Sequence, residues 1–98
     1  MLDFYVIKDE QPKPNYPEQV NLEFISGLDS GTFDNLISKG IIDSRFDYYS
    51  DFRWNSNLID QINSKVSKIK NSDSDIDKLN LILKKALELK SGIIAYCD

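Results

Sequence analysis

The chain contains no histidine and only one cysteine, Cys97. A single cysteine excludes an intrachain disulfide, and the absence of histidine excludes Ser-His, Cys-His and histidine-metal chemistry together. The four glycines stand singly, so the sequence also lacks a phosphate-binding loop, a nucleophile elbow and a dinucleotide fingerprint. Cys97 is expected to be a small buried apolar side chain. These absences favour a protein that is not an enzyme and that binds no metal or cofactor.

Long hydrophobic runs are also missing. No run approaches the roughly 20 apolar residues that a membrane-spanning helix requires. The first apolar segment, Leu2–Ile7, is interrupted by Asp3 and followed by charged residues, whereas a signal peptide begins with basic residues and has a longer apolar stretch. We therefore expect a cytoplasmic protein that makes no contact with a membrane.

The 98 residues carry a net charge of −4 and are 41% hydrophobic, which is typical of one globular domain covering residues 1–98. The charge is uneven. Residues 1–63 contain 5 basic and 11 acidic side chains, a net charge of −6, whereas residues 64–98 contain 7 basic and 5 acidic ones, a net charge of +2. Nucleic-acid binding depends on clustered Lys and Arg, so the acidic front half disfavours it. The same charge favours a basic protein partner, with solubility alone as the alternative explanation.

Alternating apolar and polar residues predict two strands, at Leu2–Ile7 and Val20–Ile25. The connection Lys8–Gln19 contains the three prolines of the chain, which exclude a helix or an inner strand there. Without a crossover element between them, the two strands are expected to pair antiparallel. The Pro14–Pro17 spacing also matches a ligand of an SH3 domain, although a stiff loop is the preferred explanation.

Helical spacing of apolar residues predicts three helices. The first is short, begins at the capping residues Asp29–Thr32 and is ended by Gly40. The other two span about 55–70 and 76–90, and a short apolar strand, Ile93–Tyr96, follows them. The order strand–strand–helix–helix–helix–strand predicts an α+β fold. A small, mostly antiparallel sheet of about three strands would be covered by helices on one face.

Two features of the helical half leave alternatives. The polar break Asn71–Asp75 resembles an aspartate-rich calcium loop, but it lacks the turn glycine and the late bidentate glutamate. Its aspartates are therefore expected to stabilise the N-terminus of the helix that follows, where the helix dipole attracts negative charge. Leu81 and Leu89 lie partly off the apolar stripe of the last helix. They are expected to widen the core-facing stripe, and a homodimer seam is the alternative, so the chain is expected to be a monomer or a homodimer.

The central stretch, Arg45–Trp54, concentrates the residues best suited to special roles. It holds the only tryptophan, both arginines and two of the five tyrosines, and irregular backbone is expected there. One interpretation is structural: Phe46, Phe52 and Trp54 fill the gap between the sheet and the helices. The two aspartates of the stretch would then pair with the arginines or cap backbone amides.

A second interpretation is protein binding, with aromatic and charged side chains of the stretch at the surface. Tyr, Trp and Arg dominate the energetics of protein interfaces, and neighbouring carboxylates would attract a basic partner. The candidate partner-binding residues are Asp47, Tyr48, Tyr49, Asp51, Arg53 and Trp54.

A third interpretation is an enzyme. Asp47 and Asp51 would form a carboxylate pair or hold a hard metal ion, with Arg45 or Arg53 as the electrophile. No other feature of the sequence supports this interpretation.

The chain resembles the immunity proteins of bacterial polymorphic-toxin and contact-inhibition systems. The features that carry the resemblance are its size, its acidic front half, its lack of catalytic residues and the segment Asp47–Asp51. Its richness in Asn, Lys, Ile and Ser looks like the product of a low-GC bacterial genome. The resemblance implies a stoichiometric inhibitor that covers the active site of a cognate toxin, often a nuclease, where Asp or Glu would mimic phosphate. An adaptor or regulatory module that binds a folded host protein is the alternative.

Overall fold

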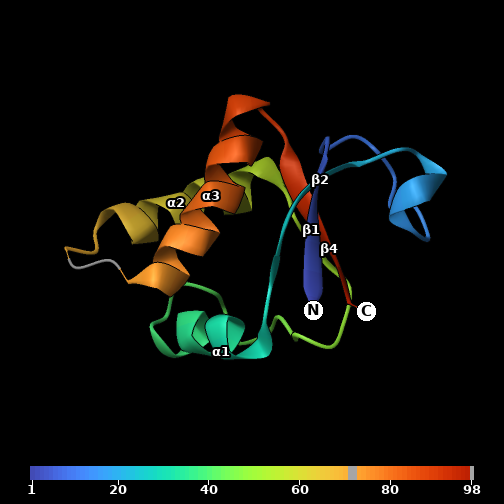
Figure 1. Ribbon diagram of the computed structural model, residues 1–98. Coiled ribbons are helices and arrows are strands. Elements are labelled where there is room, and N and C mark those ends of the chain that lie inside the picture. The colour runs from blue at the N-terminus through green and yellow to red at the C-terminus, as the bar shows by residue number, and fades with distance from the viewer. Residues whose placement is uncertain (71–72, 98) are drawn as a thin grey trace.

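An antiparallel sheet of four strands packs against three helices in the computed structural model, which describes residues 1–70 and 73–97 (Figure 1). The strands are β1 (Leu2–Ile7), β2 (Glu23–Leu28), β3 (Phe52–Trp54) and β4 (Gly92–Cys97), and the α-helices are α1 (Ser30–Ser38), α2 (Ser56–Ser67) and α3 (Ser74–Glu88). A short 3-10 turn, Pro17–Gln19, corrects the expectation that Lys8–Gln19 contains no helix, because proline is tolerated in the first turn of a helix. The order across the sheet is β2-β1-β4-β3. The predicted α+β class is confirmed. The additional strand, β3, lies in the central stretch, where the sequence predicts irregular backbone.

The helices cover one face of the sheet, and the proline-rich connection between β1 and β2 covers the other (Figure 1). Alternation along β4 separates the two faces. Ile93 and Ala95 join the main core with the helices, whereas Ile94 and Tyr96 belong to a smaller cluster on the opposite face. The Tyr96 hydroxyl donates a buried hydrogen bond of 2.8 Å to the carbonyl of Pro14, which fastens the connection to the sheet. Because both of its faces are covered, β4 is apolar at nearly every position.

β2 begins and ends later than the predicted strand Val20–Ile25, although it pairs antiparallel with β1 as expected. Its register against β1 shifts at Ile25, which forms a β-bulge. The strand continues past its predicted end at Ile25 through Ser26-Gly27, and Leu28 reaches the core. A bulge at the edge of a sheet also discourages pairing with strands of other molecules.

Side-chain oxygens cap the start of each of the three α-helices. Asp29, Asn55 and Asp73 each accept a hydrogen bond from the amide three residues later, at distances of 2.7–2.9 Å. α1 ends close to Gly40, whose φ of 74° is a left-handed conformation that glycine adopts without strain. α2 ends earlier than predicted, and α3 begins and ends earlier. The first two residues of the predicted polar break, 71 and 72, lie outside the described residues.

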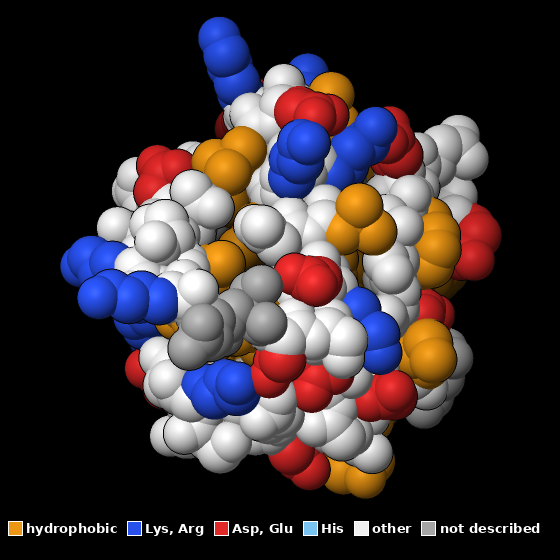
Figure 2. Space-filling model, turned by 60° about the vertical axis from the view of Figure 1, so that its left-hand side comes forward, with side chains coloured by type: hydrophobic (Ala, Val, Ile, Leu, Met, Phe, Trp, Pro, Cys, Tyr) orange, Lys and Arg blue, Asp and Glu red, His pale blue; other side chains and the backbone are white. Residues whose placement is uncertain are grey.

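The two leucines that lie off the apolar stripe of α3 are exposed. Leu81 is 59% and Leu89 is 45% exposed, so the expectation that they widen the core-facing stripe is wrong. Figure 2 shows the helix side of the molecule, where hydrophobic side chains form small patches among Lys, Arg, Asp and Glu side chains of both signs. Among the described side chains on this side, the view shows no large continuous apolar patch of the kind that marks a protein interface.

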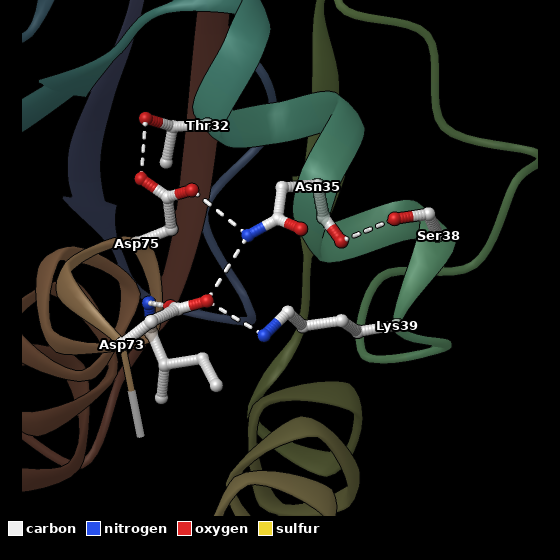
Figure 3. A network of polar contacts seen from close by, with 7 residues as sticks. Thr32, Asn35, Ser38, Lys39, Asp73 and Asp75 are labelled. Carbon is white, nitrogen blue, oxygen red and sulfur yellow. Dashed lines mark hydrogen bonds and ion pairs between the residues drawn. The ribbon is translucent and has the colours of Figure 1, made fainter. Parts of the chain in front are cut away.

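A network of polar side chains ties α1 to the start of α3 (Figure 3). Asn35 donates hydrogen bonds to Asp73 and Asp75, at 3.2 and 2.8 Å. Thr32 donates to Asp75 at 3.0 Å, and the ammonium of Lys39 donates to Asp73 at 2.6 Å. The hydrogen bonds from Lys39 and from the helix amide that Asp73 caps hold the pKa of Asp73 at about 2, below its ordinary value of 3.8. By fixing α1, the network also fixes the point at which the chain leaves α1 for the central stretch.

This network predicts that part of the stability is lost in acid. A carboxylate whose pKa is lowered by folding stabilises the native state above its unfolded pKa, and the contribution disappears as the pH falls toward the folded pKa. Asp73→Asn keeps the capping oxygen and removes the charge. We expect the stability advantage of the wild type over this variant to shrink between about pH 4 and about pH 2. Urea denaturation at a series of pH values measures it, and an advantage that does not change with pH would contradict the network.

β4 passes close to the backbone at the end of β3 at Gly92, and substitution of this glycine tests the contact. A Cβ atom there would lie 2.5 Å from the carbonyl oxygen of Trp54 and 3.2 Å from the Cα of Asn55, so alanine would push the strands apart. We expect Gly92→Ala to lower the free energy of unfolding by about 1–3 kcal/mol. Gly31→Ala in α1 is the matched control, because its Cβ would meet only a side-chain oxygen at 3.7 Å and alanine favours the helix. Equal losses in urea denaturation would show that the contact is not tight.

Candidate functional site

The central stretch divides into a surface loop and the strand β3. Trp54 is completely buried, and the centroid of its ring lies 5.4–6.0 Å from those of Phe4, Phe46 and Phe52. These aromatic rings pack with the main core between the sheet and the helices, as the structural interpretation predicts. The expectation that Trp54 lies at the surface and binds a partner is therefore wrong. Alternation along β3 turns Phe52 and Trp54 to the same side, toward the helices.

Arg53 and Asp51 make contacts within the protein. Arg53 points to the opposite side of β3 from its neighbours, and its Nη2 donates to the carbonyls of Lys8 and Asp9 at 2.6 and 3.0 Å. Asp51 accepts a hydrogen bond of 2.9 Å from the amide of Cys97, and its second carboxylate oxygen lies 3.8 Å from the ammonium of Lys13 in the proline-rich connection. Both side chains thus attach neighbouring segments to the edge of the sheet.

The loop Asp43–Asp51, named the tandem-turn loop, joins α1 to β3. In Figure 1 it runs along the bottom of the molecule, past the end of the sheet at which both termini lie. Asp43 and Asp47 each begin a turn of the same kind. Each carboxylate accepts a hydrogen bond from the amide two residues later, at 2.9 and 3.0 Å, and each carbonyl accepts one from the amide three residues later, at 3.1 Å. The third residue of each turn, Arg45 or Tyr49, is exposed.

The two adjacent tyrosines of the loop have different environments. Tyr48 is partly buried, and the centroid of its ring lies 5.8 Å from that of Phe33 in α1. Burial raises the pKa of the Tyr48 hydroxyl above its ordinary value. Tyr49 is 74% exposed, with its ring edge-on to that of Tyr48 at 5.1 Å. Tyr48 therefore anchors the second turn to the core, and the turn presents Tyr49 to solvent.

The tandem-turn loop is acidic. Asp43, Asp47 and Asp51 are exposed, and Arg45 is the one basic residue of the loop. Asp47 and Asp51 accept hydrogen bonds from different elements, the loop itself and β4, so the geometry gives no support to a carboxylate pair. Within residues 1–70 and 73–97, no three acidic or cysteine side chains gather where they could hold a metal ion. No helix in the same ranges is long and apolar enough to span a membrane.

Asp43 is the residue of this loop that the sequence interpretation missed. The signal is present in the sequence, since Asp43 and Asp47 stand four positions apart and each precedes residues that suit a turn. Aspartate is favoured at the first position of a turn because its carboxylate bonds to the backbone two residues later. Recognising the repeat would have placed two turns in the loop instead of unspecified irregular backbone.

No protein-family model matches the chain, and neither the curated proteins nor the solved structures include a significant match.

The turn that Asp47 begins predicts different results for two substitutions. Asp47→Ala removes the oxygen that accepts from the Tyr49 amide, whereas Asp47→Asn keeps an oxygen in the same place and removes only the charge. We expect hydrogen exchange at the amides of Tyr49 and Ser50 to become about tenfold faster in the alanine variant and to stay near the wild-type rate in the asparagine variant. Equal exchange rates in the two variants would show that the carboxylate does not hold the turn.

Proposed function

We propose that the protein acts by binding another protein through the tandem-turn loop. Most concretely, it would be an immunity-type inhibitor that covers a cognate bacterial toxin. The observation that carries the proposal is the exposure of Tyr49, at 74%, on a loop whose backbone is already fixed by two aspartate turns. An ordered loop loses little conformational entropy when it binds, so more of its contact energy appears as affinity.

The chemistry of the loop indicates the kind of partner. Tyr49 and Arg45 belong to the residue types that contribute most to protein interfaces. The carboxylates of Asp43 and Asp47 would attract a basic surface and raise the rate of encounter. A toxin that cleaves nucleic acid offers such a surface around its substrate channel, which the acidic loop would cover in place of phosphate. Under this proposal the inhibitor acts in the bacterial cytoplasm.

The candidate binding surface differs from the set of residues that the sequence indicates, because Trp54 is buried and two of the other side chains have supporting roles. Tyr49 and Asp47 are its central residues, and Asp43 and Arg45 extend it. Asp51 contributes through the part of its carboxylate that remains exposed. Tyr48 supports the surface by packing on α1. Arg53 supports it by donating hydrogen bonds to the backbone carbonyls of Lys8 and Asp9.

Site-specific photo-cross-linking in cells of the source organism tests the proposal. A photoreactive phenylalanine analogue in place of Tyr49 is expected to capture one protein at one-to-one stoichiometry. The same analogue in place of Tyr16, which is 55% exposed on the proline-rich connection, is the matched control. The captured protein should be toxic when expressed alone and should be inhibited by an equimolar amount of the wild-type chain.

The possible outcomes of the cross-linking experiment distinguish the inhibitor from its alternatives. Capture of the same proteins at both positions, or of none at position 49, would contradict binding through the tandem-turn loop. Capture at position 49 of a host protein that is not toxic and is not inhibited would replace the inhibitor with the adaptor or regulatory module. Tyr49→Ala should then weaken the purified complex by about tenfold or more if the side chain is a central contact.

A further inference from the structure

A hollow beside the tandem-turn loop contains both arginines of the chain. Its volume is about 570 Å³, and it lies where the loop, β3 and the start of α2 meet. Its lining residues are Arg45, Phe46, Arg53, Asn55, Asn57, Leu58 and Gln61. None of the acidic side chains within residues 1–70 and 73–97 lines it, although acidic residues outnumber basic ones in the chain by 16 to 12. The hollow is thus a locally basic site in an acidic protein.

Neither arginine forms an ion pair with a carboxylate of the described residues. Arg45 is placed by its guanidinium lying over the Phe46 ring, 4.8 Å from the centroid. Arg53 is placed by its Nη2, which donates to two backbone carbonyls. The remaining guanidinium donors of Arg53, Nε and Nη1, make no hydrogen bond to a described residue. Two positioned cations without an anionic partner therefore line one concavity.

The carboxamides of the hollow add neutral hydrogen-bonding groups. Asn57 and Gln61 are four residues apart on α2, so they lie on the same side of the helix. The oxygen of Asn55 accepts from the Leu58 amide as the helix cap, which leaves its amino group free to donate. Such groups recognise polar parts of a ligand without demanding a charge.

We propose that this hollow binds a small organic molecule that carries a phosphate or carboxylate group. The planar guanidinium of Arg45, aided by that of Arg53, matches the oxygens of either group. The start of α2 adds no free anion site, because the amide and the hydroxyl of Ser56 already donate to the Asp9 carboxylate, so the two guanidinium groups carry the attraction. A volume of about 570 Å³ lies within the usual range for small-molecule sites and exceeds what the anionic group alone would fill, so the carboxamides would contact the remainder. This site shares Arg45 with the surface proposed for the protein partner, but binding of the small molecule can be tested without that partner.

Nuclear magnetic resonance titration of the ¹⁵N-labelled chain tests this site at constant ionic strength. Inorganic phosphate, a nucleoside monophosphate and succinate are the probes. At least one should shift the resonances of residues 45, 46, 53, 55, 57 and 61 with saturation at a Kd of about 1 mM or tighter. Tighter binding of a phosphate probe or of succinate identifies which anionic group the site prefers. Tighter binding of the nucleotide than of inorganic phosphate would show that the carboxamides contact the organic part.

Two variants separate the site from general charge effects. Arg45→Gln should weaken binding by about tenfold, because one charge-assisted hydrogen-bonding group is lost. Lys84→Gln removes the same charge from the exposed surface of α3 and should leave the Kd unchanged. Arg45 is exposed, so the variant should fold, and an unchanged thermal midpoint verifies this. Shifts that do not saturate with any probe, or equal binding by wild type and Arg45→Gln, would overturn the proposal.

Discussion

The pairing of β3 with β4 is the constraint on which the rest of the structure depends. β3 has only three residues, and its ladder sets Phe52 opposite Ala95 and Trp54 opposite Ile93. This register turns two large rings toward the helices, where they fill the core beside Phe4. The indole Nε1 of Trp54 is buried without a hydrogen-bond partner among the described atoms, which costs free energy. The apolar contacts of the ring must offset that cost, so the strand pairing and the aromatic cluster depend on one another.

The position of β3 also dictates the tandem-turn loop. α1 is fixed against α3 by the polar network at Asp73, and the chain must travel from the end of α1 to the outer edge of the sheet. Two successive aspartate turns cover that distance, and Tyr48 in the second turn packs on α1. The loop is therefore ordered by the core on one side and by its own hydrogen bonds on the other. Arg45 belongs to both the loop and the neighbouring hollow, so the two proposed surfaces adjoin.

Local signals in the sequence were sufficient to predict most helices and strands. The features that the sequence did not reveal depend on contacts between residues far apart in the chain. Helix caps such as Asp29 and Asn55, and the stop at Gly40, act within a few residues and are readable from the sequence. A three-residue strand is too short to show alternation, and the bulge at Ile25 leaves no pattern, so β3 and the register of β2 were missed. The contacts of Arg53 join positions 44 and 45 residues apart, which no local pattern records. For the same reason the sequence could not separate the buried Trp54 from the exposed Tyr49.

The central claim is that a preformed loop, and not the outer face of α3 or the edge strand β2, meets the partner. Hydrogen exchange of the whole chain, free and in complex with the protein captured by cross-linking, tests this most directly. The account predicts that added protection is concentrated in residues 43–51, with little change along α3 and β2. Protection concentrated around Leu81 and Phe24, with residues 43–51 unchanged, would contradict it and would move the binding surface to the opposite edge of the sheet.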